Sequence, residues 1–283
     1  MLKHAFFSGR KVALLTQHGK ERVIAPVLEP GLGCIVEHVT GFDTDQLGTF
    51  SRDKPRPGSQ LDAARLKARK GMEIAGHSIG IASEGSFGPD PHGGLFPWDV
   101  EILVWIDDQL GIEVVGMAQG PARSGQTLAA DWQEVVAFAE QEGFPRHQLI
   151  LRPDGENDPR IQKDIADWMP LKEAFQRCHA EASTGRVFVE LDLRAFANPT
   201  RMAVIERAAV DLLQRLQVAC PSCGAPGFSV SERLQGLPCA GCGLPTRVHR
   251  SEVWTCVRCT HRLAQPRQDR TRADPAECSF CNP

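Results

Sequence analysis

Four Cys-x-x-Cys pairs in the C-terminal tail constrain this 283-residue chain more than any other feature of its sequence. Eight of the ten cysteines belong to these pairs, and the other two, Cys34 and Cys178, lie far upstream. Such clustering indicates metal ligands rather than disulfides. Two thiolates on a tight turn supply half of a tetrahedral zinc site, so we predict two structural zinc ions, each held by four cysteines. The predicted ligands are Cys220, Cys223, Cys239, Cys242, Cys256, Cys259, Cys278 and Cys281.

The spacing of the pairs is typical of zinc ribbons. Fifteen residues separate Cys223 from Cys239, and eighteen separate Cys259 from Cys278. Both gaps allow consecutive pairs to share an ion, but the pairs could also interleave, with the first sharing an ion with the third. A tail this poor in apolar residues needs metal staples to fold. We therefore predict a boundary near residue 218, with an α/β domain at 1–218 and a double zinc-ribbon module at 219–283.

The charge of the tail leaves two kinds of partner open. The tail carries eight arginines and five acidic residues, and it also contains Trp254. A basic surface with an aromatic side chain is compatible with nucleic-acid contact. Ribbons with four cysteine ligands are more often structural or protein-binding, so a protein partner remains the other expectation.

Bulk composition narrows the setting of the whole chain. The formal net charge is −3, so no strong overall field steers the protein toward nucleic acid or an anionic membrane. No apolar run approaches the ~20 residues that span a bilayer. The first ten residues lack the apolar core and cleavage site of a signal peptide. These features predict a cytoplasmic protein without a membrane contact.

Predicted strands alternate with predicted helices through residues 11–216, which indicates a mixed α/β domain, a mixed sheet flanked by helices. Asp131 caps one predicted helix and Gly143 ends it. Asn198 followed by Pro199 begins the last helix. The expected strands are 11–16, 33–39, 79–83, 186–193, 148–152 and a hairpin of 99–107 with 112–117, and the expected helices are 21–29 (short or kinked at Pro26), 61–74, 131–142, 161–181 (interrupted at Pro170) and 198–216.

The stretch 79–89 reads as a short apolar strand, then Glu84, then a glycine-rich turn. This order places one carboxylate at the end of a buried strand, where backbone amides can approach a ligand closely. In open α/β sheets, ligands sit outside the carboxyl ends of the strands. Glu84 is therefore a candidate catalytic or metal-binding residue facing the same cleft as Lys20. The alternative is a glutamate in an exposed turn.

A second candidate lies at 194–201, between a predicted strand and the N-terminus of the last helix. Arg194 and Arg201 could converge with backbone amides on a phosphate or a carboxylate. The alternative is a helix capped by Asn198 with two surface arginines.

Four short motifs follow one another between residues 11 and 88. They occupy 16–20 after the first strand, 45–50 in an acidic loop, 62–68 at the start of a helix, and 83–85. In this order they resemble motifs of the inosine-triphosphate-pyrophosphatase-like superfamily, which hydrolyses non-standard nucleoside triphosphates. Over its full length, with the cysteine-rich tail, the chain looks like an uncharacterised bacterial family, a domain of unknown function. The first resemblance implies substrate contacts from Thr16, Lys20, Thr49, Lys67 and Ser83.

The chemistry that this resemblance implies suits the residues present. A triphosphate needs a cation against its phosphates, which Lys20 beside a helix N-terminus can provide. Hydrolysis needs Mg²⁺ held by carboxylates, and Glu84 with Asp43 or Asp45 could hold it. We therefore predict Mg²⁺-dependent hydrolysis of a nucleoside triphosphate or a related phosphorylated nucleotide. The alternatives are a non-catalytic nucleotide-binding protein and a nucleic-acid-processing enzyme, each using the zinc tail for its partner.

Overall fold

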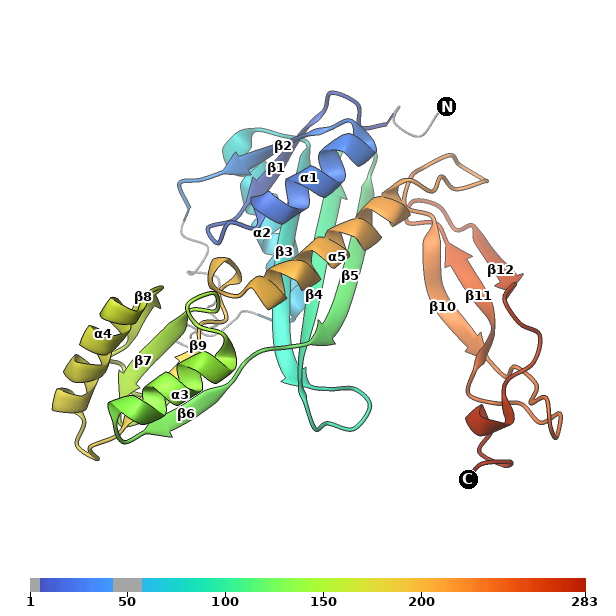
Figure 1. The fold of residues 1–283 in the computed structure, drawn as a ribbon. Coiled ribbons are helices and arrows are strands. Elements are labelled where there is room, and N and C mark those ends of the chain that lie inside the picture. Colours follow the sequence, from blue (N-terminus) through green and yellow to red (C-terminus); the bar gives the residue numbers. More distant parts are fainter. Residues whose placement is uncertain (1–5, 43–57) are drawn as a thin grey trace.

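The computed structural model describes residues 6–42 and 58–283, and within them the chain forms three β-sheets (Figure 1). A five-stranded sheet lies at the centre, a four-stranded sheet lies beside one end of it, and a three-stranded sheet follows the last helix. The protein is thus a mixed α/β protein with a small C-terminal module, which confirms the predicted fold class.

The central sheet has the strand order β2-β1-β3-β4-β5. The first three of these strands are parallel, and β3, β4 and β5 are antiparallel neighbours, so the predicted hairpin is confirmed. Helices α1 and α5 cover one face and α2 covers the other (Figure 1). The strands are β1 (Lys11–Leu15), β2 (Ile35–Val39), β3 (Ile79–Pro89), β4 (Pro97–Asp107) and β5 (Ile112–Pro121), and the helices are α1 (Glu21–Leu32), α2 (Gln60–Ala75) and α5 (Pro199–Leu216).

Strand pleating divides the centre of the protein into two cores. Ile81 and Leu103 point toward α1 and α5, whereas their neighbours Ala82 and Val104 point toward α2. Successive side chains of a strand face opposite sides of the sheet, so every buried position of β3 and β4 belongs to one core or the other. The same alternation decides where the polar side chains of these strands point.

Helix α1 runs through both of its prolines, whereas the sequence predicts a shorter or kinked helix. Pro26 and Pro30 lie on the exposed side, where the carbonyls that lose a hydrogen bond can meet water. Ile24, Leu28 and Leu32 are fully buried on the opposite side. Packing of this apolar stripe outweighs the two missing hydrogen bonds.

The four-stranded sheet is inserted between β5 and α5 and has its own apolar core. Its strand order is β6-β9-β7-β8, and all neighbours are antiparallel. Its elements are β6 (Gln126–Ala129), α3 (Trp132–Glu142), β7 (Leu149–Pro153), β8 (Gln162–Ile165), α4 (Trp168–Glu181) and β9 (Val187–Leu191).

One predicted helix of this insert, 161–181, is wrong in its first third. Residues 162–165 form strand β8 on the edge of the sheet, and α4 begins only at Trp168, where Asp167 caps it. Pro170 therefore lies in the first turn of α4 rather than inside a long helix. A proline is tolerated there because the first-turn N–H groups have no partner within the helix.

Strand β3 is also longer than predicted. It continues through the glycines to Pro89 and pairs residue by residue with β4, so Glu84 lies within a strand and not before a turn. Gly85 serves a close approach: a Cβ there would lie 2.1 Å from Glu101 Oε1 and 2.7 Å from Arg201 Nη2. The pairing partner β4, which is distant in sequence, overrides the local turn signal of the glycines.

Gly85→Ala is accordingly expected to destabilise the protein by about 1–3 kcal/mol, because the methyl group must displace a buried ion pair. Denaturant unfolding of the full chain measures this. Gly88→Ala on the same strand is the matched control, since a Cβ there meets no atom within 4 Å. Equal stability of the two variants would contradict the packing described for Gly85.

The C-terminal module is an antiparallel meander of three strands, seen at the right of Figure 1. Its strands are β10 (Ser229–Gln235), β11 (His249–Thr255) and β12 (Arg262–Pro266). None of the helices in the described part of the chain combines the length and apolar character that a membrane crossing requires.

Candidate functional sites

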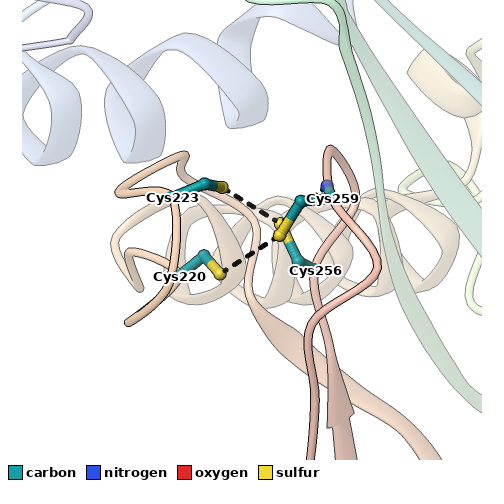
Figure 2. Close-up of side chains that lie close together, drawn as sticks. All are labelled: Cys220, Cys223, Cys256 and Cys259. Atoms are coloured by element: carbon teal, nitrogen blue, oxygen red, sulfur yellow. Dashed lines mark hydrogen bonds between the residues drawn. The ribbon is translucent and has the colours of Figure 1, made fainter.

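The eight tail cysteines form two groups of four, at opposite ends of the three-stranded meander. Within each group the sulfur atoms all lie within 4.8 Å of one another. In the group shown in Figure 2, Cys220 Sγ lies 3.8 Å from Cys259 Sγ, and Cys223 Sγ lies 3.6 Å from Cys256 Sγ. Four sulfurs at about 2.3 Å from a central zinc form a tetrahedron with edges of about 3.8 Å. The sulfur geometry therefore fits a tetrahedral zinc site.

The second group repeats this arrangement. Cys239 Sγ lies 3.8 Å from Cys281 Sγ, and Cys242 Sγ lies 3.7 Å from Cys278 Sγ. The backbone N–H of Gly241 donates to Cys239 Sγ. Backbone N–H groups of Cys242 and Gly241 lower the pKa of the Cys239 thiol to about 7, which favours the thiolate that zinc requires. Two tetracysteine groups that could bind two zinc ions are therefore present, and each has all four ligands.

The pairing of the groups is the interleaved one, not the consecutive one that the spacing suits. Strand β10 carries the chain away from the first Cys-x-x-Cys pair, β11 returns it to the third, and β12 leads away again to the fourth. A meander has only two ends, so the first and third pairs meet at one end and the second and fourth at the other. Each ion would then link two segments of the chain at one end of the three-stranded sheet.

A buried polar cluster lies on the α1 and α5 face of the central sheet. Lys20 Nζ donates to the carbonyl oxygen of Ser83 at 3.0 Å and to its hydroxyl at 3.3 Å. The Ser83 hydroxyl donates to Glu101 Oε2 at 3.3 Å, and Arg201 Nε donates to Glu101 Oε1 at 2.6 Å. The cluster links the start of α1, the strands β3 and β4, and the start of α5. Three of the predicted substrate contacts, Lys20, Ser83 and Arg201, therefore meet here.

Glu84 points to the other face of the sheet, where it forms an ion pair with Lys67 of α2. Its carboxylate is 3% exposed, and its carbonyl accepts a hydrogen bond from Gln60 Nε2. The sequence prediction placed Glu84 and Lys20 in one cleft. Because Ser83 and Glu84 are consecutive in a strand, their side chains point to opposite faces of the sheet. Lys20 lies on the face of Ser83, so Lys20 and the Glu84 carboxylate do not share a cleft.

The two faces still form one electrostatic unit. Burial lowers the pKa of the Lys20 ammonium to about 8, and the positive charge of Arg201 adds to this effect. The negative charges of Glu101 and Glu84 raise the same pKa, and Lys67 lowers it. Buried ionisable groups with shifted pKa values are often found at functional sites.

The remaining predicted residues lie around this cluster or outside the described residues. Thr16 follows β1 and is buried, and its carbonyl accepts a hydrogen bond from His38 Nε2. Arg194 is paired with Asp192 and Asp164, so its guanidinium is neutralised by carboxylates, as that of Arg201 is by Glu101. Asp43, Asp45 and Thr49 lie outside the described residues.

Two carboxylates of β4 were missed by the sequence prediction. Glu101 is fully buried in the polar cluster, and Asp99 is 1% exposed. Neither oxygen of the Asp99 carboxyl has a hydrogen-bond partner among the described residues. Burial and the negative charge of Glu101 raise the pKa of Asp99 to about 7. The sequence did contain a signal for these two residues. Asp99 and Glu101 are two positions apart in an otherwise apolar strand, a spacing that places both side chains on one buried face.

Asp99→Asn is expected to stabilise the protein above pH 7. The folded-state pKa of about 7 lies above the unfolded value of about 4. Between these values the folded protein holds a proton that the unfolded chain has lost, so wild-type stability falls as the pH rises through this window. Asparagine carries no charge, and the gain at pH 8 should be about 4 kcal/mol at most. Denaturant unfolding at pH 5 and pH 8 measures it.

Asp107→Asn, near the other end of β4, is the control. Asp107 accepts hydrogen bonds from Arg10 at 2.6 and 2.9 Å, so its loss should destabilise the protein at both pH values. A stability loss at pH 8 for Asp99→Asn, similar to that of Asp107→Asn, would show that Asp99 is a paired structural carboxylate.

An α/β fold with a tail of two tetracysteine groups defines the general class of this protein. The chain belongs to the family described as a domain of unknown function (DUF6671), whose model matches residues 67–283. No curated protein matches the chain. The family match agrees with the prediction of an uncharacterised domain family, and the resemblance of residues 11–88 to the inosine-triphosphate-pyrophosphatase-like superfamily stays a prediction.

Proposed function

We propose that the protein is a cytoplasmic, Mg²⁺-dependent hydrolase of a nucleoside triphosphate or a related phosphorylated nucleotide, and that its tail holds two structural zinc ions. One observation carries the proposal. Lys20, Lys67, Ser83 and Glu84 come from three separate segments of the chain, and they lie together around one part of β3, where the charges of Glu84 and Lys67 act on Lys20.

The side chains on the α2 face suit the binding of a phosphate and a cation. Glu84 offers carboxylate oxygens, the ligand class that Mg²⁺ prefers, and Mg²⁺ is usually held by one or two carboxylates together with substrate phosphates. When bound, Mg²⁺ would neutralise phosphate charge and activate a water molecule. Lys67, now paired with Glu84, would turn to the phosphates. Asp43 and Asp45, the other predicted ligands, lie outside the described residues.

Glu101 and Arg201, on the α1 and α5 face of the sheet, would position β3 rather than touch the phosphates. Glu101 fixes Arg201, and its hydrogen bond to Ser83 fixes the hydroxyl beside Lys20. Such a network favours a single conformation of β3, because Lys20 Nζ, the Ser83 hydroxyl and Arg201 Nε each donate to a buried acceptor.

A non-catalytic nucleotide-binding protein is the second candidate, and one observation favours it. Glu84 is almost completely buried and already has a cationic partner, so it could serve as part of a structural ion pair. Its zinc module would then present a surface to a protein or to nucleic acid.

A panel of nucleoside triphosphates separates the two candidates. Release of phosphate or pyrophosphate in the presence of Mg²⁺ supports the hydrolase. A rise in the unfolding temperature with a nucleotide, without any turnover, supports the binding protein. Steeply salt-dependent binding of an oligonucleotide would point instead to a nucleic-acid function of the tail.

A further inference from the structure

A groove of about 650 Å³ lies where the first turn of α5 meets the end of α3 and the loop after it. It joins the central sheet to the inserted sheet and uses none of the residues of the proposed nucleotide site. The polar residues that matter most in its lining are Arg123, Arg146, His147, Thr200 and Arg207.

The arginines of the groove are poorly neutralised. Arg207 and Arg123 donate to the backbone carbonyls of Gln119 and Gln141, each at 3.3 Å. The Arg123 guanidinium lies 4.0 Å from a carboxylate oxygen of Glu142. Arg146 is exposed and has no ion-pair or hydrogen-bond partner among the residues that the structure describes. Glu140 also lines the groove, so the lining carries three guanidinium groups and one carboxylate, and this excess of positive charge favours an anion.

His147 supplies an independent sign of a missing ligand. It is 7% exposed, and its Nε2 lies 2.9 Å from the Thr200 hydroxyl. Its Nδ1 has no hydrogen-bond partner in the described part of the chain. Nδ1 lies beside Gly143, another lining residue, where a Cβ would be 3.4 Å away. When Thr200 donates to Nε2, the ring proton sits on Nδ1, which is then a buried donor without an acceptor among the described residues.

The first turn of α5 also favours the binding of an anion in this groove. Pro199 and Thr200 open this helix of 18 residues and both line the groove. The N-terminus of a helix carries a partial positive charge from its aligned peptide dipoles. Fork-shaped guanidinium groups, a helix N-terminus and an unpartnered ring nitrogen are all suited to oxygen atoms that carry negative charge.

We propose that this groove binds an oxyanion of the phosphate type, held by Arg123, Arg146 and Arg207 with His147 at its floor. This binding site goes beyond the proposed hydrolase function. It requires neither Mg²⁺ nor any residue of β3, and it would remain if the chain had no nucleotide hydrolase activity.

Calorimetric titration of the zinc-loaded full chain with inorganic phosphate, in Mg²⁺-free buffer at constant ionic strength, tests the proposal. We expect saturable binding that Arg146→Gln and Arg207→Gln each weaken about tenfold, because each removes a charge-assisted contact. Arg186→Gln is the matched control, since Arg186 is an exposed arginine of the inserted sheet outside the groove.

Two results would overturn the proposal. One is the absence of saturable phosphate binding to the wild-type chain. The other is an equal loss in Arg146→Gln and Arg186→Gln, which would indicate general charge attraction. Arg146 is exposed, so its substitution is not expected to affect folding. Titration with acetate in parallel shows whether the groove requires a phosphate or accepts a carboxylate.

Discussion

Removal of zinc is expected to unfold the C-terminal module and to leave the central sheet and the inserted sheet folded with their helices. The module buries few apolar side chains besides its cysteines, chiefly Phe228, Leu237 and Val253. Structural zinc contributes about 10–16 kcal/mol to the folding of small zinc-finger peptides, more than a core of this size can supply. Elemental analysis should give two zinc ions per chain. A strong chelator should abolish the amide signals of the module in an NMR spectrum of the full chain.

A pair of cysteine substitutions tests the assignment of ligands. Cys256→Ala should lower the zinc content to one per chain, because Cys220, Cys223 and Cys259 are left one thiolate short. Cys178→Ala, in helix α4, should retain both ions because Cys178 is buried in the apolar core of the insert. Chelator-free protein with a folded tail and almost no zinc would contradict the assignment. Retention of both ions by Cys256→Ala would contradict the assignment of Cys256 as a zinc ligand.

Glu84→Gln is expected to reduce nucleotide turnover by about a hundredfold or more if the proposed hydrolase function is correct. Glutamine keeps the shape of the side chain but removes the negative charge that holds the cation or accepts the proton. The measurement is the rate of phosphate or pyrophosphate release with the best substrate of the nucleotide panel. Lys20→Ala should instead weaken substrate binding, since Lys20 faces Ser83 rather than the Glu84 carboxylate.

Glu113→Gln provides the matched control for this experiment. Glu113 pairs with Arg65 of α2, as Glu84 pairs with Lys67 of the same helix, but it lies on β5 and is more exposed. Its substitution should change turnover less than twofold. An unchanged rate for Glu84→Gln, in a protein that does hydrolyse a nucleotide, would remove Glu84 from the catalytic residues without removing the activity.

Local sequence signals predicted both ends of α3 and the start of α5, since each depends on a few adjacent residues. Asp131 and Asn198 accept hydrogen bonds from backbone N–H groups in the first turns of α3 and α5, as N-cap residues do. Gly143 ends α3 with a φ of 80°, a conformation that glycine adopts without strain. Metal binding by the four Cys-x-x-Cys pairs is likewise predictable from local sequence, because each pair places two thiolates on one turn.

Other features depended on partners that the local pattern does not contain. The glycines of β3 predict a turn from their local sequence, but pairing with β4 makes them part of a strand. Likewise, the local pattern of 162–165 predicts a helix, but pairing with β7 makes it a strand. The pairing of the cysteine pairs followed from the number of strands between them, although their spacing suited a different arrangement.

The candidate site divides in the same way. Local sequence signals singled out Lys20, at a helix start, and Glu84, beside a glycine, whereas only the family resemblance singled out Lys67. Only the tertiary structure decided that Lys67 neutralises Glu84, and that Arg201 pairs with Glu101 from a hundred residues away. The physical reason is that strand pleating and strand pairing set the direction of each side chain, and both are settled by contacts between segments distant in sequence.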